Sequence, residues 1–148
     1  FGPSASPYGQ YLDLNNNFNQ LSEKSIIKII DLKTSRLYQA AFATGWLLSG
    51  GSLSEVNLLK KLGVHLGRAM QMQDDLADIK QDYDLNRKIN ISLCYGKDRA
   101  KHLIKDELRM FENTMDKIKL IHDSEELIKI LKPINRYLNE LEVAEGCG

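Results

Sequence analysis

The sequence predicts an all-α protein that folds as a single helical bundle. Apolar residues recur at three- and four-residue intervals through several long segments, which is the spacing of an amphipathic helix. Glycines and capping sequences divide these segments from one another, and no stretch alternates apolar and polar residues as a half-buried strand would. With 148 residues the chain can bury a core. We therefore expect one helical domain over residues 1–148, with a loop-rich N-terminal segment at 1–20.

The first predicted helix runs from Ser22 to about Ser49, after a segment rich in glycine, proline, serine and asparagine. The pair Gly50–Gly51 is expected to end it, because glycine accepts the left-handed conformation found after many helices. The sequence Ser52–Glu55 (SLSE) then fits a capping box. It predicts the start of a second helix that continues to about Tyr83.

The remaining sequence predicts a polar loop at residues 84–90. Three more helices are expected after it, at 91–95, 98–121 and 124–143. Gly96 is expected to close the short helix, and the following long helix has a clear apolar stripe. Pro133 lies inside the last helix, where it should kink or split it because proline lacks the backbone N–H.

Composition excludes several classes of function. A content of 43% hydrophobic and 27% charged residues is typical of a globular domain, and a formal net charge of zero argues against a nucleic-acid or polybasic membrane surface. The apolar run 37–48 is too short to span a bilayer. Cys94 and Cys147 lack metal-site spacing, which favours a reducing compartment and a cytoplasmic location. The chain begins with Phe1, as a fragment or processed product would.

A stripe of glycines and acidic residues on the second helix is the main indication of function. Its members fall within roughly 100° of one another on a helix: Gly63, Gly67, Gln71, Asp74, Asp78 and Asp82. The flanking positions are mostly apolar, so we expect a buried helix whose glycines allow another backbone to approach. Isolated buried carboxylates are costly. They should be protonated, paired with cations or bound to metal.

Asp74, Asp75 and Asp78 form a DDxxD motif. Asp74 and Asp78 are one helical turn apart, so both can reach the same ion, and aspartate oxygens suit Mg²⁺ shared with phosphate oxygens. The alternative is a solvated acidic patch, since DDxxD also occurs on helix surfaces. The apolar surroundings, the glycines and the preceding Gln71 favour the metal site.

Two lysines are candidates for the same site. Lys33 shares a helix face with small and apolar residues and can point into the bundle, although a surface lysine is the alternative. Lys88 follows Asp78 by ten residues and can fold back over the helix end, or remain a solvated loop lysine. Magnesium and lysines together stabilise a leaving diphosphate. His65 lies on the face opposite Asp74 and is expected to be a packing residue rather than a ligand.

Four segments in this order resemble the trans-isoprenyl diphosphate synthases, the polyprenyl synthetase family. They are GQYLDL, DLKTSRLYQAAFATG, GRAMQMQDDLAD and KINISLCYGKDRAKHL, at residues 9–14, 31–45, 67–78 and 88–103. The resemblance implies the isoprenoid-synthase-type helical bundle. It also implies that this chain corresponds to the C-terminal half of a usual member.

The resemblance also implies a site. The metal ligands would be those of the family's second aspartate-rich motif, Asp74, Asp75 and Asp78, with Asp74 the first choice as direct Mg²⁺ ligand. Contacts with the allylic diphosphate would come from Lys33, Thr34, Gln71 and Lys88. The implied catalytic residues are Lys33, Lys88 and Asp74. The implied reaction is metal-assisted loss of diphosphate from an allylic prenyl diphosphate, followed by attack of isopentenyl diphosphate, in a geranyl-, farnesyl- or geranylgeranyl-type synthase.

The chain departs from the family pattern because a first aspartate-rich motif is missing, and Asp13 alone cannot replace it. The first hypothesis is therefore the C-terminal part of a prenyltransferase, inactive alone and completed by an N-terminal half or partner subunit. The second is a non-catalytic subunit or interaction module of the same fold. A terpene-synthase-like enzyme is the third. Half a bundle should expose apolar helix faces, so we expect a homo- or hetero-oligomer.

Overall fold

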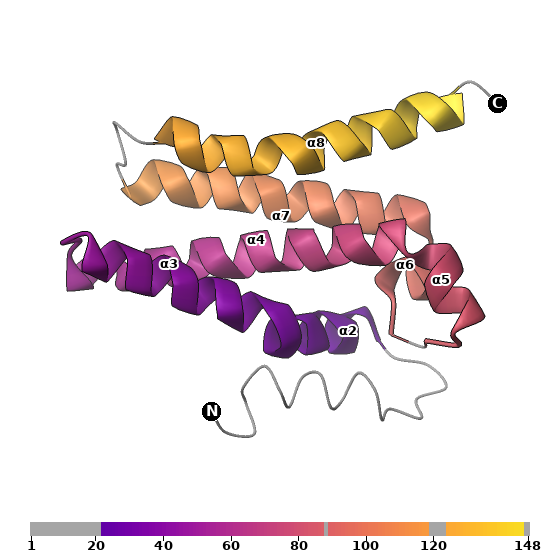
Figure 1. Cartoon of the computed structure of the whole chain (residues 1–148), viewed down its shortest axis with the longest axis horizontal. Helices are drawn as coiled ribbons and strands as arrows, with labels where there is room; N and C mark the ends of the chain where they lie inside the picture. The colour runs from indigo at the N-terminus through magenta and orange to yellow at the C-terminus, as the bar shows by residue number, and fades with distance from the viewer. Residues whose placement is uncertain (1–21, 88, 119–123, 147–148) are drawn as a thin grey trace.

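The structure is a computed structural model that describes residues 22–87, 89–118 and 124–146. Within these ranges the regular structure is entirely helical, which confirms the predicted fold class. Figure 1 shows long helices stacked side by side along the molecule, with α4 between α3 and α7 and with α8 outside α7. The predicted segment 1–20, together with Lys88 and Cys147, lies outside the described residues.

The first helical segment is interrupted by a π-helical turn. It consists of α2 (Glu23–Ile30), η1 (Asp31–Ser35) and α3 (Arg36–Leu48). Ser22 caps its start, because its side chain accepts a hydrogen bond from the backbone N–H of Ser25. At the other end Gly50 has a φ of 87°, as expected for a glycine that ends a helix. The predicted ends are confirmed, whereas the π-helical turn was not predicted.

The second helical segment is broken where the sequence predicts a continuous helix. A 3₁₀ turn, η2 (Leu53–Glu55), begins it, followed by α4 (Val56–Ala77) and α5 (Ile79–Asp84). Between the two helices Asp78 has φ −93° and ψ 11°, outside helical geometry. The expectation of one helix to about Tyr83 is wrong, and the break falls within the acidic motif.

The last three helices agree closely with the predictions. They are α6 (Ile91–Tyr95), α7 (Lys97–Ile118) and α8 (Ser124–Gly146). Gly96 separates the first two with a φ of 86°. Helix α8 includes Pro133 without being divided into two helices, so the expected split does not occur.

The core lies around α4. Side chains from α2, α4, α6, α7 and α8 form one buried apolar cluster, whose largest fully buried members include Ile26, Leu62, Leu66, Met72, Ile91, Ile104, Phe111, Leu131, Ile134 and Leu138. Phe42 from α3 reaches Phe111 of α7 in an edge-to-face contact, with ring centroids 6.0 Å apart. Among the described helices, none has the length and apolar character needed to cross a bilayer.

The predicted close approach at the glycines of α4 is confirmed. A Cβ atom added to Gly63 would lie 2.5 Å from the backbone nitrogen of Gln39, and one added to Gly67 would lie 2.6 Å from the Cα of Ser35. No real side chain accommodates such distances without movement of the backbone. The two glycines therefore allow η1 and α3 to pack directly on α4, beside the acidic motif.

Candidate functional site

The three aspartates of the DDxxD motif occupy two different environments. Asp74 and Asp78 are exposed, whereas Asp75 is buried with 7% of its surface accessible. Their separation follows from helix geometry, since neighbouring residues lie about 100° apart around the axis. Burial on α4 is thus one-sided at its acidic end, and the expectation that the whole helix is enclosed is wrong there.

Asp74 and Asp78 form an exposed acidic pair at the end of α4. The backbone N–H of Asp78 donates to the carbonyl of Asp74 at 2.9 Å, which keeps the two residues one turn apart. Partial burial raises the pKa of Asp74, the charge of Asp78 raises it further, and Lys33 opposes the rise. A cation bound between the two carboxylates would stabilise the ionised form of Asp74.

Asp75 has both carboxylate oxygens occupied. Oδ1 accepts a hydrogen bond from Nε2 of Gln71 at 3.0 Å, and Oδ2 accepts one from the backbone N–H of Ile91 at 3.0 Å. Burial nevertheless raises the pKa of Asp75 to about 6, because desolvation outweighs these two hydrogen bonds. The geometry favours a positioning role for this carboxylate between α4 and α6.

A chain of side-chain hydrogen bonds connects the π-helical turn with the acidic motif. Thr34 Oγ1 donates to Gln71 Oε1 at 2.7 Å, and Gln71 then donates to Asp75. Lys33, from the same turn, lowers the pKa of both Asp74 and Asp75 through its charge. A cavity of about 10 Å³ lies between these residues, lined by Ile29, Ile30, Lys33, Gln71, Asp75 and Ile89. It has room for about one water molecule.

The π-helical turn explains how consecutive residues reach this site. In η1, Ser35 is fully buried and faces Gly67, while Thr34 reaches Gln71 one turn further along α4. A π-helical turn rotates the residues after it relative to an α-helix, and such turns are frequent at functional sites. Lys33, Thr34, Gln71 and Asp75 are therefore close together in the structure, whereas Lys88 lies outside the described residues.

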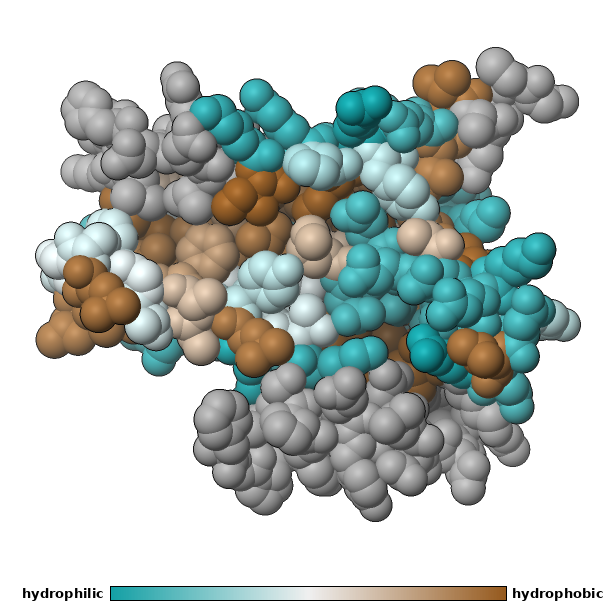
Figure 2. Space-filling view, in the orientation of Figure 1, coloured by the Kyte–Doolittle hydropathy of each residue, from teal (hydrophilic) through white to brown (hydrophobic). Residues whose placement is uncertain are grey.

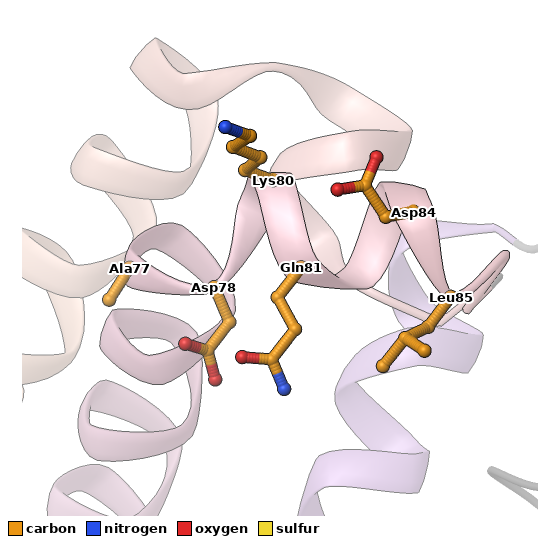
Figure 3. Close-up of a pocket in the computed structure, with 6 residues that line it drawn as sticks. All are labelled: Ala77, Asp78, Lys80, Gln81, Asp84 and Leu85. Atoms are coloured by element: carbon orange, nitrogen blue, oxygen red, sulfur yellow. The ribbon is translucent and has the colours of Figure 1, made fainter.

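A wider pocket opens at the break between α4 and α5. It has a volume of about 470 Å³ and is lined by Ala77, Asp78, Lys80, Gln81, Asp84 and Leu85. Figure 3 shows the side chains of Asp78 and Gln81 extending in the same direction, while Lys80 and Asp84 extend away from them. Asp78 and Gln81 are three residues apart, a spacing that also places two side chains on the same face of a continuous helix.

Sequence reasoning missed Asn90, which is fully buried. Its Nδ2 donates to the carbonyl of Asp75 at 2.6 Å and to Asp82 Oδ2 at 2.9 Å, and its Oδ1 accepts from the backbone N–H groups of Ser92 and Leu93. Asp82 also pairs with Arg87 at 3.1 Å, so its carboxylate is neutralised within the fold. An asparagine directly before a short helix is an N-cap pattern that could have identified Asn90.

His65 belongs to a separate ion network, as its predicted position opposite Asp74 suggests. Its Nδ1 lies 2.6 Å from Glu107, while Arg68 binds Asp31 through two hydrogen bonds of 2.7 Å and Glu107 through one of 3.1 Å. The network joins η1, α4 and α7. Over the ranges that the structure describes, no group of three or more histidine, cysteine, aspartate or glutamate side chains is arranged to hold a metal ion.

Comparisons with known proteins give the family. The polyprenyl synthetase family matches residues 6–98. Octaprenyl diphosphate synthase of Escherichia coli (strain K12) is 34% identical over 91 residues, covering 60% of this chain and 28% of that protein. Farnesyl diphosphate synthase of Micrococcus luteus is 24% identical over 151 residues, covering 95% of this chain and 47% of that protein.

A solved structure from Marinomonas sp. MED121, assigned as a farnesyl-diphosphate synthase, shares the fold. Its TM-score is 0.72 at 23% identity, with 90% of this chain and 47% of that chain covered. The present chain thus spans between about a quarter and about half of the length of the relatives that it matches. Because the family match extends over more than half of the chain, the protein belongs to the polyprenyl synthetase family.

Proposed function

We propose that this chain forms one side of the active site of a magnesium-dependent isoprenyl diphosphate synthase. The observation that carries the proposal is the hydrogen-bond chain from Thr34 through Gln71 to Asp75, which joins η1 to α4 directly beside the exposed Asp74 and Asp78. The family and the names of the relatives support prenyl diphosphate chemistry. The substrates would be an allylic prenyl diphosphate and isopentenyl diphosphate.

The residues present fit a magnesium ion that is shared with a phosphate. Mg²⁺ is usually held by one or two carboxylates together with water and phosphate oxygens, and Asp74 and Asp78 supply such a pair. Asp75 completes the predicted motif by fixing the end of the helix rather than by offering an open oxygen. When bound, the metal would neutralise charge on the departing diphosphate.

The surrounding side chains would bind and orient the diphosphate. Lys33 lies close enough to the acidic motif to influence the pKa of two of its carboxyl groups, so its ammonium group can contact oxygens of a metal-bound diphosphate. Thr34 and Gln71 hold the π-helical turn at its distance from α4. Lys88 is proposed as the second lysine from its sequence position alone.

We propose that the site is incomplete in this chain and that an N-terminal half or a partner subunit completes it. Helix α3 has an exposed apolar stripe, defined as Leu37, Ala40, Ala41, Thr44 and Leu48, with Leu37 56% and Leu48 83% exposed. Figure 2 shows brown and pale atoms over the end of the molecule where α3 lies in Figure 1, and hydrophilic atoms around α5. The lone chain should therefore have little or no condensation activity.

This stripe also favours a second candidate, a non-catalytic subunit that uses the fold for interaction. A purely structural subunit does not need a diphosphate site, so ligand binding separates the two functions. Robust condensation of isopentenyl and allylic diphosphates by the purified chain would contradict the proposal that it is incomplete.

Calorimetric titration of the folded chain with Mg²⁺ and a non-hydrolysable allylic diphosphate tests the site. We expect binding that Asp74→Asn weakens at least about tenfold, the loss typical even for an outer partner of a metal ligand. Asp116→Asn is the matched control, because Asp116 is an exposed aspartate on α7. No binding by the folded wild-type chain, or equal effects of the two substitutions, would refute the site.

A further inference from the structure

The buried side chain of Asn90 spans the break between α4 and α5. Its Nδ2 group contacts the Asp75 carbonyl in the last turn of α4 and the Asp82 carboxylate on α5. We call these two hydrogen bonds the Asn90 bridge. They flank Asp78, which lies between the two helices in a non-helical conformation.

The Asn90 bridge stabilises a helix end that would otherwise have unsatisfied groups. Carbonyls in the last turn of a helix lack a partner further along it, and Asn90 supplies one for Asp75 at 2.6 Å. The same side chain caps α6 through Oδ1, which places the Ile91 N–H against the Asp75 carboxylate. Backbone and side chain of Asp75 are thus fixed from one point on the following segment.

We propose that Asn90 is a positioning residue that sets the relative placement of Asp74 and Asp78 by holding the break at Asp78. This inference rests on the proposed function, because these two carboxylates are its proposed metal ligands. Asp74 belongs to the regular end of α4, whereas Asp78 has the backbone angles of the break. The backbone hydrogen bond from Asp78 to Asp74 sets their spacing along α4, and the bridge contacts the chain on both sides of Asp78, at Asp75 and at Asp82, so it would hold the backbone angles at Asp78.

An amide is required at this position. The bridge has two acceptors, a carbonyl and a carboxylate, which need a donor group with two N–H bonds. Aspartate would still cap α6 because it is a strong N-cap residue, but it would present an acceptor to both partners. The substitution Asn90→Asp therefore removes the bridge and retains the cap.

The test compares Asn90→Asp with the wild-type chain and with Thr114→Val. Thr114 is a buried polar residue on α7 that donates to the Met110 carbonyl at 2.7 Å, so its replacement also removes one buried hydrogen bond. Mg²⁺ and Ca²⁺ affinities are measured calorimetrically in the presence of inorganic diphosphate. Mg²⁺ demands near-ideal octahedral geometry, whereas Ca²⁺ tolerates varied ligand arrangements.

We expect Asn90→Asp to lower Mg²⁺ affinity by about tenfold or more and Ca²⁺ affinity by less, which shifts the Mg²⁺/Ca²⁺ ratio. A general loss of stability would lower the affinities for both ions equally. Thr114→Val should therefore leave the Mg²⁺/Ca²⁺ affinity ratio unchanged. An unchanged ratio in Asn90→Asp overturns the inference. If the wild-type chain binds neither ion, the proposed function fails, and the metal part of the inference fails with it.

Amide hydrogen exchange distinguishes these two failures. Faster exchange in α5 in Asn90→Asp, relative to Thr114→Val, supports positioning of Asp78 even without a bound ion, and equal exchange overturns it.

A second measurement uses the wild-type chain alone, so it does not require that a variant folds. The Asn90 side-chain amide resonance should shift during Mg²⁺ titration more than that of the exposed Asn57, and equal responses would contradict the coupling.

Discussion

At the scale of single residues, the same amino acid has different roles at neighbouring positions of one motif. Asp74 is exposed at the end of α4, while Asp75 is buried and accepts hydrogen bonds from Gln71 and Ile91. Exposure makes the first carboxylate available to a ligand. Burial makes the second one sensitive to pH, because an ionised carboxylate without solvent is costly even when it is hydrogen-bonded.

Asp75 should make the metal-free chain less stable as the pH rises. Burial raises the pKa of its carboxyl group from the ordinary 3.8 to about 6 in the folded chain. Between these two pH values the folded chain therefore keeps a proton that the unfolded chain has released. Wild type should therefore lose stability relative to Asp75→Asn between pH 4 and 6, by about 3 kcal/mol at most. Urea unfolding in EDTA at several pH values measures this difference. If the free energy of unfolding of the wild type instead rose relative to that of Asp75→Asn over this range, burial would not be the cause of the pKa shift.

The residue types of the candidate site were predictable, but their orientation was not. Helical spacing alone placed Gln71 and Asp74 on one face and identified Gly63 and Gly67 as contact positions. Which aspartate faces inward depends on η1 and α6, which are distant in sequence. The role of Asn90 was missed for the same reason, since its partner Asp75 lies fifteen residues earlier.

At the scale of elements, the crossing of α4 with η1 and α3 holds the two sides of the candidate site together. The glycines allow backbone contact there, whereas a Cβ atom added to Gly45, on the exposed part of α3, would meet no other atom within 4 Å. The crossing therefore offers a direct comparison between a glycine needed for packing and a glycine that only weakens a helix.

Gly67→Ala should lower the free energy of unfolding by about 1–3 kcal/mol, the usual cost of overpacking. Gly45→Ala should raise it by up to about 1 kcal/mol, because alanine is the better helix former. Chemical denaturation of both variants measures the contrast. If Gly67→Ala were as harmless as Gly45→Ala, the close approach between α4 and η1 would be wrong.

The ion network of Arg68 gives α4 a second connection to its neighbours. Arg68→Ala would leave Asp31 and Glu107, both partly buried, without their shared cation, so we expect a loss of about 2 kcal/mol in unfolding free energy. Arg136→Ala removes an exposed pair with Glu140 and should cost about 0.5 kcal/mol or less. Denaturation of both variants at low and high salt measures these costs, and equal losses would refute a structural network.

Element boundaries could be predicted where local chemistry decides them, as at Ser22, Gly50 and Gly96. The π-helical turn at Asp31–Ser35 and the break at Asp78 could not, because apolar spacing continues through both. These departures depend on tertiary contacts: Ser35 against Gly67 and Asn90 against Asp75. Both departures adjoin the candidate site, where local preference and global packing are expected to conflict.

At the scale of the whole molecule, the described helices bury a core around α4 but leave the apolar stripe of α3 uncovered. The sequence predicted the all-α class because apolar residues recur at three- and four-residue intervals through several long segments. It also predicted exposed apolar faces from the resemblance to half of a larger fold. It could not identify the face, because that depends on which side of α3 packs on α4.

The apolar stripe should cause the isolated chain to self-associate as its concentration rises, since exposed apolar surface favours association. The double substitution Leu37→Glu and Leu48→Glu places charges at both ends of the stripe and should restore a monomer. Leu85→Glu with Val143→Glu is the matched control, because these side chains are also exposed but lie after α5 and on α8. Sedimentation velocity over a range of concentrations measures the effect. If the stripe is the interface, only Leu37→Glu with Leu48→Glu should shift the distribution towards the monomer. Equal shifts for both double substitutions would indicate non-specific association.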